Sequence, residues 1–477
     1  MLFNSLAFAL FLPVVFVLYW FVMARSLRAQ NLLIIAASFV FYGWWDWRFL
    51  FLLVGTSLVD YFAALTIDRT GDKRRRKILL GLSLTANLGV LGTFKYFDFF
   101  AHSFHDAFAS VGIQLDIATL GFILPVGISF YTFQALSYTI DVYRSQLKAT
   151  RDPFAFMAFI SFFPQLVAGP IERATNMLPQ MLRPRVFSSA DAADGMRQML
   201  WGFFKKVVIA DNCAPVVNDI FAHHHQYGAS TLLLGAFLFA FQIYGDFSGY
   251  SDIAIGCGRL FGIKLMRNFA FPYFSRDIAE FWRRWHISLN TWFRDYLYFP
   301  LGGSRGGAAQ RVRNIMVIFL VSGLWHGANW TFVAWGAFNA LLFIPLMLSG
   351  RNRKYLDHAG DGRLVPSLRE LAGILVTFGF TLVAWVLFRA DTITQAFDYL
   401  RRMAARSLFS ASHVWDPWLM SLIGLLVVSE WINRTRQHAL EVDHLPAWGR
   451  RLIYTAVFGL IFVFGRFAST DFIYFQF

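Results

Sequence analysis

The stretch VSGLWHGANWTFVAW, residues 321–335, places the titratable side chain of His326 inside an apolar run that extends from 314 to 348. One straight helix over that run would be roughly 50 Å long at 1.5 Å per residue, which exceeds the ~30 Å hydrocarbon core of a bilayer. Arg313 precedes the run and Arg351 follows it, so both ends are expected on the cytoplasmic side. We therefore predict two short helices joined at GLWHGANW, because glycine and asparagine favour bends. This bend would hold His326 deep in the protein.

The composition indicates a membrane protein. The chain of 477 residues is 57% hydrophobic and 15% charged, whereas about a quarter of the residues in soluble globular proteins are charged. Many apolar runs are long enough to cross a bilayer, which predicts an all-α polytopic membrane protein. The net charge of +14 falls in short loops, as the positive-inside rule describes, so no nucleic-acid partner is expected. Cys213 and Cys257 form no CxxC pair, which argues against a structural disulfide or a zinc site.

Basic loops set the expected orientation. The loop 68–77, DRTGDKRRRK, belongs on the cytoplasmic side, which puts the N-terminus and, by parity, the C-terminus outside. The loop 389–416 carries four arginines on the side expected to be outside, against the positive-inside rule. Either this loop is interfacial or the expected number of membrane crossings is off by one. The first apolar segment lacks a cleavage signal and is expected to be retained. Helices are expected near residues 1–23, 30–45, 48–67, 78–94, 120–140, 195–222, 231–256, 370–388, 417–433 and 452–467.

Three further segments are not expected to be simple spans. The segment 154–169 is short, contains Pro164 and lies between basic residues, so we expect a re-entrant segment on the cytoplasmic side. The stretch 98–119 is acidic, without lysine or arginine, and is expected outside. The region 276–313, rich in arginine and tryptophan, is expected at the cytoplasmic interface.

His326 is the first candidate for a catalytic residue. A charged residue at the centre of a membrane helix costs about 2.5–3.5 kcal/mol on insertion scales, and ionisable residues inside membranes usually mark function. An unperturbed imidazole has a pKa near 6.5, which suits a general base. The alternative is a neutral imidazole that only bridges two helices.

The segment EFWRRWHISLNTWFRDYLYFP, residues 280–300, contains a second histidine, His286. With Arg283, Arg284 and Trp285 it is a candidate lining for an anionic ligand, because arginine donates charge-assisted hydrogen bonds to phosphates. The alternative is an interfacial helix whose arginines and tryptophans anchor it in lipid, or a salt-bridged face.

The segment QIYGDFSGYSDIAIG, residues 242–256, places Asp246 and Ser248 in an apolar helix. Asp252 lies six residues after Asp246, so the two carboxylates share a helix face poorly and a metal pair is not favoured. We expect a packed, glycine-rich helix whose carboxylates pair with nearby arginines. The tract HHH, 223–225, lies in a loop without acidic partners, and no metal is expected there.

Four motifs resemble those of the membrane-bound O-acyltransferases (MBOAT), in the bacterial branch that acetylates alginate and other exopolysaccharides. They are FPQLVAGPIER (163–173), YGDFSGYSDIAIG (244–256), FWRRWHISLNTWFRDYLYFPLGGSR (281–305) and LWHGANWTFVAWGAFNA (324–340). The resemblance implies that His326 is the essential histidine and His286 the second conserved polar position. It also implies an MBOAT-like bowl of tilted helices, with re-entrant segments and a thin centre, that separates acyl donor from acceptor.

The function expected from this resemblance is acetyl transfer across the bacterial inner membrane. Cytoplasmic acetyl-CoA would be the donor, His326 the general base, and Asn329 with backbone N–H groups the oxyanion donors. The acceptor would be an extracellular polysaccharide, alginate-like or cellulose-like, reached through a periplasmic SGNH-hydrolase-like acetyltransferase and the exopolysaccharide synthesis machinery. Transfer to a lipid or a cell-wall polymer (peptidoglycan or teichoic acid) is the alternative within the class, and a polysaccharide or lipid transporter is the alternative outside it.

The last residues, TDFIYFQF (470–477), are expected to form an extracytoplasmic aromatic tail of one membrane-embedded domain, 1–477. Tyr474 is the candidate acyl carrier, because a phenyl ester stays reactive enough to pass its acyl group on. The alternative is an aromatic tail that only docks at the membrane interface, where such side chains are common.

Overall fold

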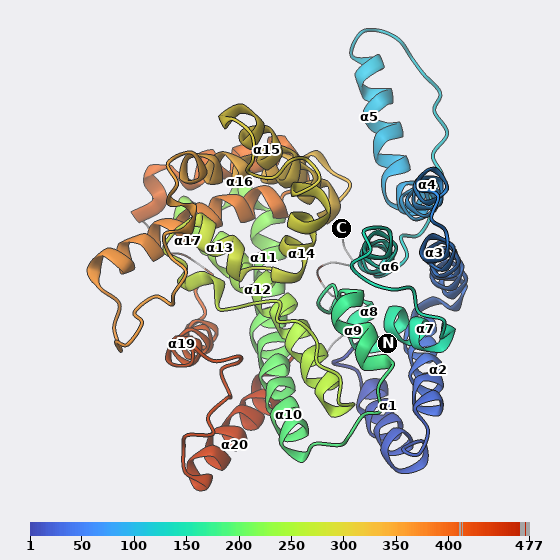
Figure 1. The fold of residues 1–477 in the computed structure, drawn as a ribbon. Helices are drawn as coiled ribbons and strands as arrows, with labels where there is room; N and C mark the ends of the chain where they lie inside the picture. Colours follow the sequence, from blue (N-terminus) through green and yellow to red (C-terminus); the bar gives the residue numbers. More distant parts are fainter. Residues whose placement is uncertain (410–411, 413, 468–472, 474–477) are drawn as a thin grey trace. The chain divides into compact units, whose positions relative to one another are not determined.

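The computed structural model describes residues 1–409, 412, 414–467 and 473 (Figure 1). Within these residues the secondary structure consists of helices, without a strand, which confirms an all-α protein. The chain divides into two compact units. The first unit comprises Met1–Ala192 and Gly258–Met266, and the second comprises Ala193–Cys257 and Arg267–Phe477. The expected single domain and the MBOAT-like bowl stay predictions.

Long apolar helices occur in both units. Among the described residues, six helical segments are long and apolar enough to cross a membrane, which agrees with a polytopic protein. They are Leu27–Arg69, Lys73–Ala109, Ala229–Leu260, Trp330–Leu348, Leu368–Arg389 and Ala447–Phe464, and Leu6–Val22 and Pro417–Ile432 are shorter apolar helices.

The first unit consists of helices α1 to α9 and the start of α10. The bounds are α1 Leu6–Val17, α2 Leu27–Asp46, α3 Leu50–Arg69, α4 Lys73–Leu91, α5 Phe97–Ala109, α6 Ile128–Tyr143, α7 Pro153–Ser161, α8 Phe163–Leu166, α9 Ala174–Met181 and α10 Ser189–Phe203. Within this unit, α5 continues α4 and projects beyond it (Figure 1). The expected helix at 120–140 is wrong at its start, because Gly127 adopts a left-handed conformation (φ 76°) and α6 begins only at Ile128.

The segment expected to be broken, 154–169, is indeed two helices. Helix α7 ends at Ser161, Phe162 leaves the helical conformation (ψ 109°), and α8 begins with Phe163. The freed backbone groups find partners: the amide of Gln165 donates to the Phe159 carbonyl at 2.7 Å, and the Phe163 N–H donates to the Ser38 hydroxyl at 3.0 Å. Non-helical backbone at membrane depth requires such partners. A re-entrant position on the cytoplasmic side stays a prediction.

The second unit carries most of the predicted site residues. Its helices are the remainder of α10, then α11 Asp211–Ala222, α12 Ala229–Leu260, α13 Ile278–Arg284, α14 Ile287–Phe293, α15 Ala308–His326, α16 Trp330–Leu348, α17 Leu368–Arg389, α18 Ile393–Met403, α19 Pro417–Ile432 and α20 Ala447–Phe464. Helix α18 lies in the loop 389–416 that breaks the positive-inside rule, and was not expected. Its last turn carries Arg401 and Arg402, where cations suit a helix C-terminus.

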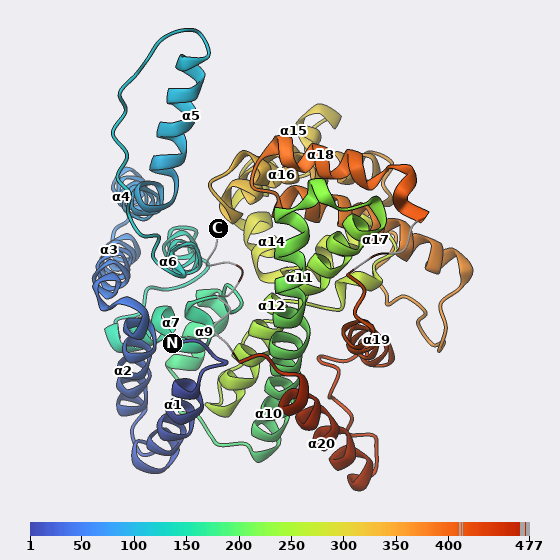
Figure 2. The same ribbon diagram turned by 180° about the vertical axis from the view of Figure 1, so that it is seen from behind.

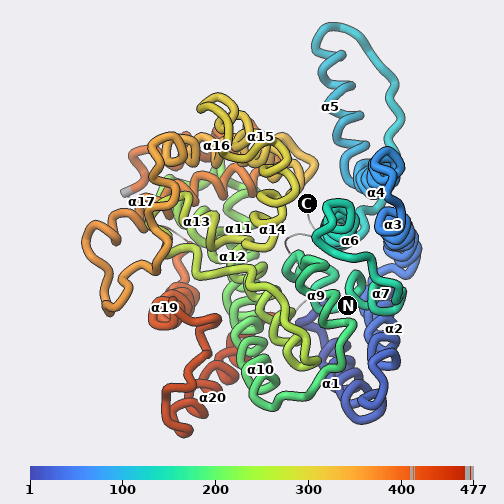
Figure 3. The backbone as a smooth tube through the Cα atoms, viewed as in Figure 1, coloured from blue at the N-terminus to red at the C-terminus, as the bar shows by residue number. Residues whose placement is uncertain are grey.

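The apolar run 314–348 forms the expected pair of helices, α15 and α16 (Figure 3). The two helices pack along each other with their backbones in close contact. A Cβ atom at Gly323 would collide with the carbonyl oxygen of Phe332, and one at Gly336 with that of Phe319. Glycine at these two positions therefore permits the tight hairpin that the bend at His326 requires.

Candidate active site

His326 is the last residue of α15, at the bend of this hairpin. Gly327 is extended, and Asn329 begins α16 as its N-cap by accepting the Thr331 N–H at 3.0 Å. The Asn329 amide also donates to the Asp391 carbonyl at 2.9 Å, which ties the bend to the end of α17. The side chain of His326 is almost completely buried. The sequence prediction of a histidine held inside the protein at a helix break is therefore confirmed.

His286 comes from a different part of the chain and meets His326 inside the second unit. It sits between α13 and α14 in a left-handed conformation (φ 45°, ψ 53°), which is uncommon for a residue other than glycine. The two imidazole centroids lie 6.1 Å apart. His286 is buried against the ring of Phe247 on α12, at 4.6 Å between centroids.

Aromatic side chains surround both imidazoles. The ring of His326 lies 5.0 to 5.4 Å, between centroids, from three of them: Trp325, Trp335 and Phe388. Burial lowers the pKa of His286 to about 3, because the surroundings cannot solvate an imidazolium. His286 is therefore neutral at physiological pH. A buried pair of imidazoles in an aromatic box suits acceptance or donation of a proton from a bound ligand.

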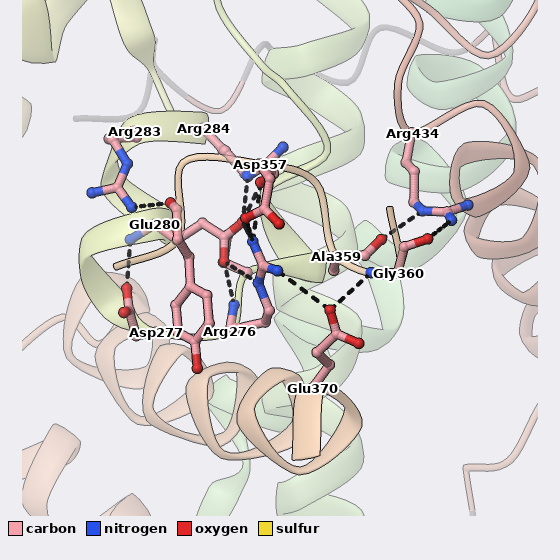
Figure 4. A network of polar contacts seen from close by, with 12 residues as sticks. Arg276, Asp277, Glu280, Arg283, Arg284, Asp357, Ala359, Gly360, Glu370 and Arg434 are labelled. Carbon is pink, nitrogen blue, oxygen red and sulfur yellow. Dashed lines mark hydrogen bonds and ion pairs between the residues drawn. The ribbon is translucent and has the colours of Figure 1, made fainter. Parts of the chain in front are cut away.

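Two arginines of the segment 276–313, Arg276 and Arg284, belong to an ion-pair network at α13 (Figure 4). Buried Arg276 contacts Glu280 at 3.0 Å, Asp357 at 2.8 Å and Glu370 at 3.3 Å, and Arg284 contacts Glu280 at 2.9 Å. This geometry matches the salt-bridged alternative that the sequence left open, with Asp357 and Glu370 as partners from outside the segment.

Arg283 hydrogen-bonds to backbone carbonyls. Its two terminal nitrogens donate to the backbone carbonyls of Asn352 and Tyr355, both at 2.6 Å. A guanidinium has five N–H donors, so Arg283 keeps donors for a further ligand. The binding of an anionic donor by Arg283 and Arg284 stays a prediction.

Two other predicted binding residues are buried in the second unit. Trp285 is stacked on Phe281 at 5.6 Å and packs against Trp385 at 4.9 Å, so it forms part of the aromatic core. Ser248, on α12, is 1% exposed, and its hydroxyl has no hydrogen-bond partner among the residues that the structure describes. Ser248 therefore has the capacity for one further polar contact.

Asp246 does not pair with arginine, as the sequence suggested, but with lysine. The ammonium of Lys206 lies 2.8 Å from Asp246 and 2.9 Å from Asp211, and Lys205 pairs with Asp252 at 2.6 Å. The expectation of arginine partners is wrong because the helix that faces α12 carries these two lysines. They were not singled out from the sequence, although ionisable residues in an apolar segment, WGFFKKVVIA (201–210), were the available signal.

Ile473 approaches this same pair of charges. The backbone N–H of Ile473 donates to the Asp246 carboxylate at 2.7 Å, and the Ile473 side chain is buried. Asp246 directly precedes Phe247, whose ring contacts His286. Tyr474 and the remainder of 470–477 lie outside the described residues, so the role of Tyr474 stays a prediction.

Comparison with known proteins identifies the class. The chain matches the membrane-bound O-acyltransferase family over residues 129–358, and this match contains both histidines. The chain belongs to this family and is a membrane-bound O-acyltransferase.

Its relatives include enzymes that act on polymers. The chain is 39% identical over 434 residues to the probable alginate O-acetylase AlgI of Pseudomonas aeruginosa, covering 90% of this chain and 80% of that protein. It is 41% identical over 423 residues to the probable alginate O-acetylase AlgI of Azotobacter vinelandii, covering 88% and 80%. It is also 36% identical over 444 residues to the peptidoglycan O-acetyltransferase of Helicobacter pylori, covering 87% and 82%.

Proposed function

We propose that this enzyme transfers acetyl groups from cytoplasmic acetyl-CoA, across the bacterial inner membrane, toward an extracellular polysaccharide of the alginate type. The observation that carries the proposal is the buried histidine pair within the segment shared with the family. The acetylating relatives support acetyl as the acyl group and a carbohydrate polymer as the final acceptor.

His326 acts as the general base of the transfer. Its imidazole takes the proton of the acceptor hydroxyl while the hydroxyl oxygen attacks the thioester carbonyl carbon. The C–S bond then breaks, and the leaving thiolate of CoA receives the proton from the imidazolium. The aromatic wall supports this role because it excludes water, which would otherwise hydrolyse the thioester.

His286 acts as a neutral polar partner beside the base. Its lowered pKa means that it brings no second positive charge to the imidazolium of His326 at neutral pH. Its ring nitrogens are buried and without hydrogen-bond partners among the described residues, so they have the capacity to bind a substrate oxygen. Asn329 and the backbone N–H groups at the bend are the candidate donors for the oxyanion.

Tyr474 acts as the intermediate acyl acceptor. Its hydroxyl would be acetylated near His326 and would then pass the acetyl group to a periplasmic SGNH-hydrolase-like partner. The hydrogen bond from Ile473 to Asp246 supports this proposal, because Ile473 directly precedes Tyr474 in the chain. Asp246 in turn directly precedes Phe247, whose ring contacts His286. Dividing one difficult transfer into two steps is the usual reason for covalent catalysis.

The orientation follows from the basic loops, with both termini outside. The arginine-rich region 276–313 would then meet acetyl-CoA at the cytoplasmic face, with Arg283 as the side chain that retains donors. Peptidoglycan is the second candidate acceptor, which the Helicobacter pylori relative favours.

The test is release of free CoA from acetyl-CoA by the purified enzyme in lipid nanodiscs. We expect CoA release beyond one turnover per chain to require an SGNH-type partner and an alginate oligosaccharide, and the acetyl group to appear on the oligosaccharide. Replacing alginate by peptidoglycan fragments distinguishes the two acceptors. Absence of acetyl-CoA turnover with either acceptor would contradict the proposal.

A further inference from the structure

Two histidines of the tract 223–225 converge on one carboxylate from a distant helix. His224 and His225 lie in the short turn between α11 and α12, and Asp398 lies on α18. The Nε2 of His224 is 3.4 Å from the Oδ2 of Asp398, and the Nδ1 of His225 is 3.2 Å from the same oxygen. The three ligand atoms lie within 4.8 Å of one another. The sequence-based expectation that this tract has no acidic partner is therefore wrong, because the partner comes from α18 (Figure 2).

These separations are long for charge-assisted hydrogen bonds. A charge-assisted N–H···O⁻ bond is about 2.7–2.9 Å long. The Nε2 of His224 is buried in a side chain that is 5% exposed, and it has no hydrogen-bond partner among the described residues. Two ligands at 2.0–2.1 Å from a tetrahedral zinc ion lie about 3.3 Å apart. The observed separations of 3.2 and 3.4 Å bracket that value.

The tautomer of His224 gives a second, independent argument. Its Nδ1 lies 3.2 Å from the backbone carbonyl of Phe221, a contact in which only the nitrogen can be the donor. In the neutral ring, Nε2 then carries the lone pair that faces the Asp398 carboxylate. Two acceptors that face each other repel, unless a cation lies between them. Donation from the other ring nitrogen to a backbone carbonyl is also the usual arrangement of a metal-binding histidine.

We propose that His224, His225 and Asp398 bind one Zn²⁺ ion, with water as the fourth ligand. Imidazole and carboxylate ligands in tetrahedral geometry suit zinc. The exposed face of His225 leaves this site open to solvent.

Zinc would tie the turn between α11 and α12 to α18, and α18 is linked to the active-site bend. The contact between these elements already includes the amide of Gln395, which donates to the Phe221 carbonyl at 3.2 Å. Gln395 also accepts the N–H of Asp391, whose carbonyl binds Asn329 beside His326. The ion would thus stabilise the end of the hairpin that holds the proposed base, without touching the substrate.

Two arginines compete with the ion for Asp398. Arg402 donates to Oδ2 at 2.7 Å, and Arg401 donates to Oδ1 at 2.8 Å. Their positive charges keep the carboxylate ionised but weaken the attraction of a second cation. Removal of Arg402 therefore strengthens zinc binding. If Asp398 served only to form ion pairs with the two arginines, this substitution would not increase the affinity for zinc.

Zinc titration of the full-length protein in detergent, purified without a histidine tag and treated with a chelator, tests the site. We expect one Zn²⁺ per chain, and at least about tenfold weaker binding in His225→Ala and in Asp398→Asn, because loss of even an outer partner of a zinc ligand costs 10–100-fold. Arg402→Gln is expected to bind more tightly. The matched control is His223→Ala, because His223 belongs to the same tract but pairs with Asp219 at 3.0 Å.

Three outcomes would overturn the site. They are absence of a stoichiometric ion in the unchanged protein, equal loss of zinc in His223→Ala and His225→Ala, and unchanged affinity in both ligand variants. His225 is mostly exposed, so its substitution leaves the fold intact and keeps the test decisive. Replacement of zinc by Co²⁺ gives an independent readout, since tetrahedral Co²⁺ absorbs visible light and its spectrum should be lost in Asp398→Asn.

Discussion

The imidazole rings of His286 and His326 lie 6.1 Å apart although one follows α13 and the other ends α15. The hairpin of α15 and α16 brings His326 into the interior of the second unit, and the left-handed turn at His286 places the second ring beside it. A non-glycine residue held in this conformation stores strain, which is common at functional sites. Sequence spacing alone does not predict such a pair.

The first prediction concerns the hairpin. Gly323→Ala should destabilise the protein and lower activity, because the new methyl group collides with the Phe332 backbone and overpacking costs about 1–3 kcal/mol. The measurement is the thermal midpoint of the detergent-solubilised protein. Gly379→Ala, in neighbouring α17, is the control, since nothing lies within 4 Å of its new methyl group. Equal midpoints for the two variants would show that the hairpin is not packed as described.

The second prediction concerns the pH dependence of stability. His286 has a folded pKa of about 3 against an unperturbed 6.5. Between these two pKa values His286 is protonated in the unfolded chain and neutral in the folded chain. The free energy of unfolding therefore falls as the pH drops from 6.5 toward 3. Between pH 7 and pH 5 the loss should be about 2 kcal/mol.

His286→Asn isolates this effect, because asparagine tolerates the left-handed conformation and does not titrate. The thermal midpoint of this variant should fall less than that of the unchanged protein on acidification from pH 7 to pH 5. A parallel fall in both proteins would mean that other groups cause the acid sensitivity.

Much of the helical order was predictable from the sequence, because apolar length and flanking charge report directly on membrane helices. The bend at His326 followed from the length of 314–348 together with the two glycines of GLWHGANW. Helix α18 was missed because its 11 residues are amphipathic and lie in a polar loop. The start of α6 was missed because one glycine conformation ends an apolar run that otherwise looks continuous.

The candidate site was predictable in its members and not in its contacts. His286 and His326 could be named from motifs, but the partners of Asp246 could not, because lysine and arginine are equivalent in a charge pattern. Trp285 was named as a candidate ligand contact, and its packing on Phe281 and Trp385 could not be read from the sequence. Ion pairs between distant segments, such as that of Arg276 with Glu370, depend on the tertiary fold.

The third prediction concerns donor binding. Arg283→Glu should raise the KM for acetyl-CoA about tenfold, because a lost charge-assisted hydrogen bond is worth about 1.5–3 kcal/mol, and kcat should change less. Arg284 is unsuitable for this test because its substitution also frees the buried Glu280. Arg294→Glu, at an exposed arginine paired with Asp295, is the control. An unchanged KM with reduced protein yield would assign Arg283 to structure alone.

The fourth prediction concerns the acyl carrier. Tyr474→Phe keeps the aromatic ring and removes the hydroxyl, so it should stop polysaccharide acetylation while protein level and partner binding stay unchanged. Mass spectrometry of the enzyme with acetyl-CoA and without partner should show an acetyl group on the tail peptide. Tyr454→Phe, on α20, is the control. Full acetylation by Tyr474→Phe, or a tail peptide that never carries acetyl, would leave the tail with a docking role.

The central claim is that His326 is the base, and turnover of acetyl-CoA by substituted enzymes tests it most directly. His326→Ala and His326→Gln should lower kcat by about 10²–10⁴-fold, the contribution of a positioned general base, while thermal midpoint and membrane insertion stay near those of the unchanged protein. His438→Gln is the matched control, because His438 is equally buried but pairs with Asp194 at 3.0 Å, outside the histidine pair. It should retain turnover. Near-normal turnover in a folded His326→Gln enzyme would contradict the account.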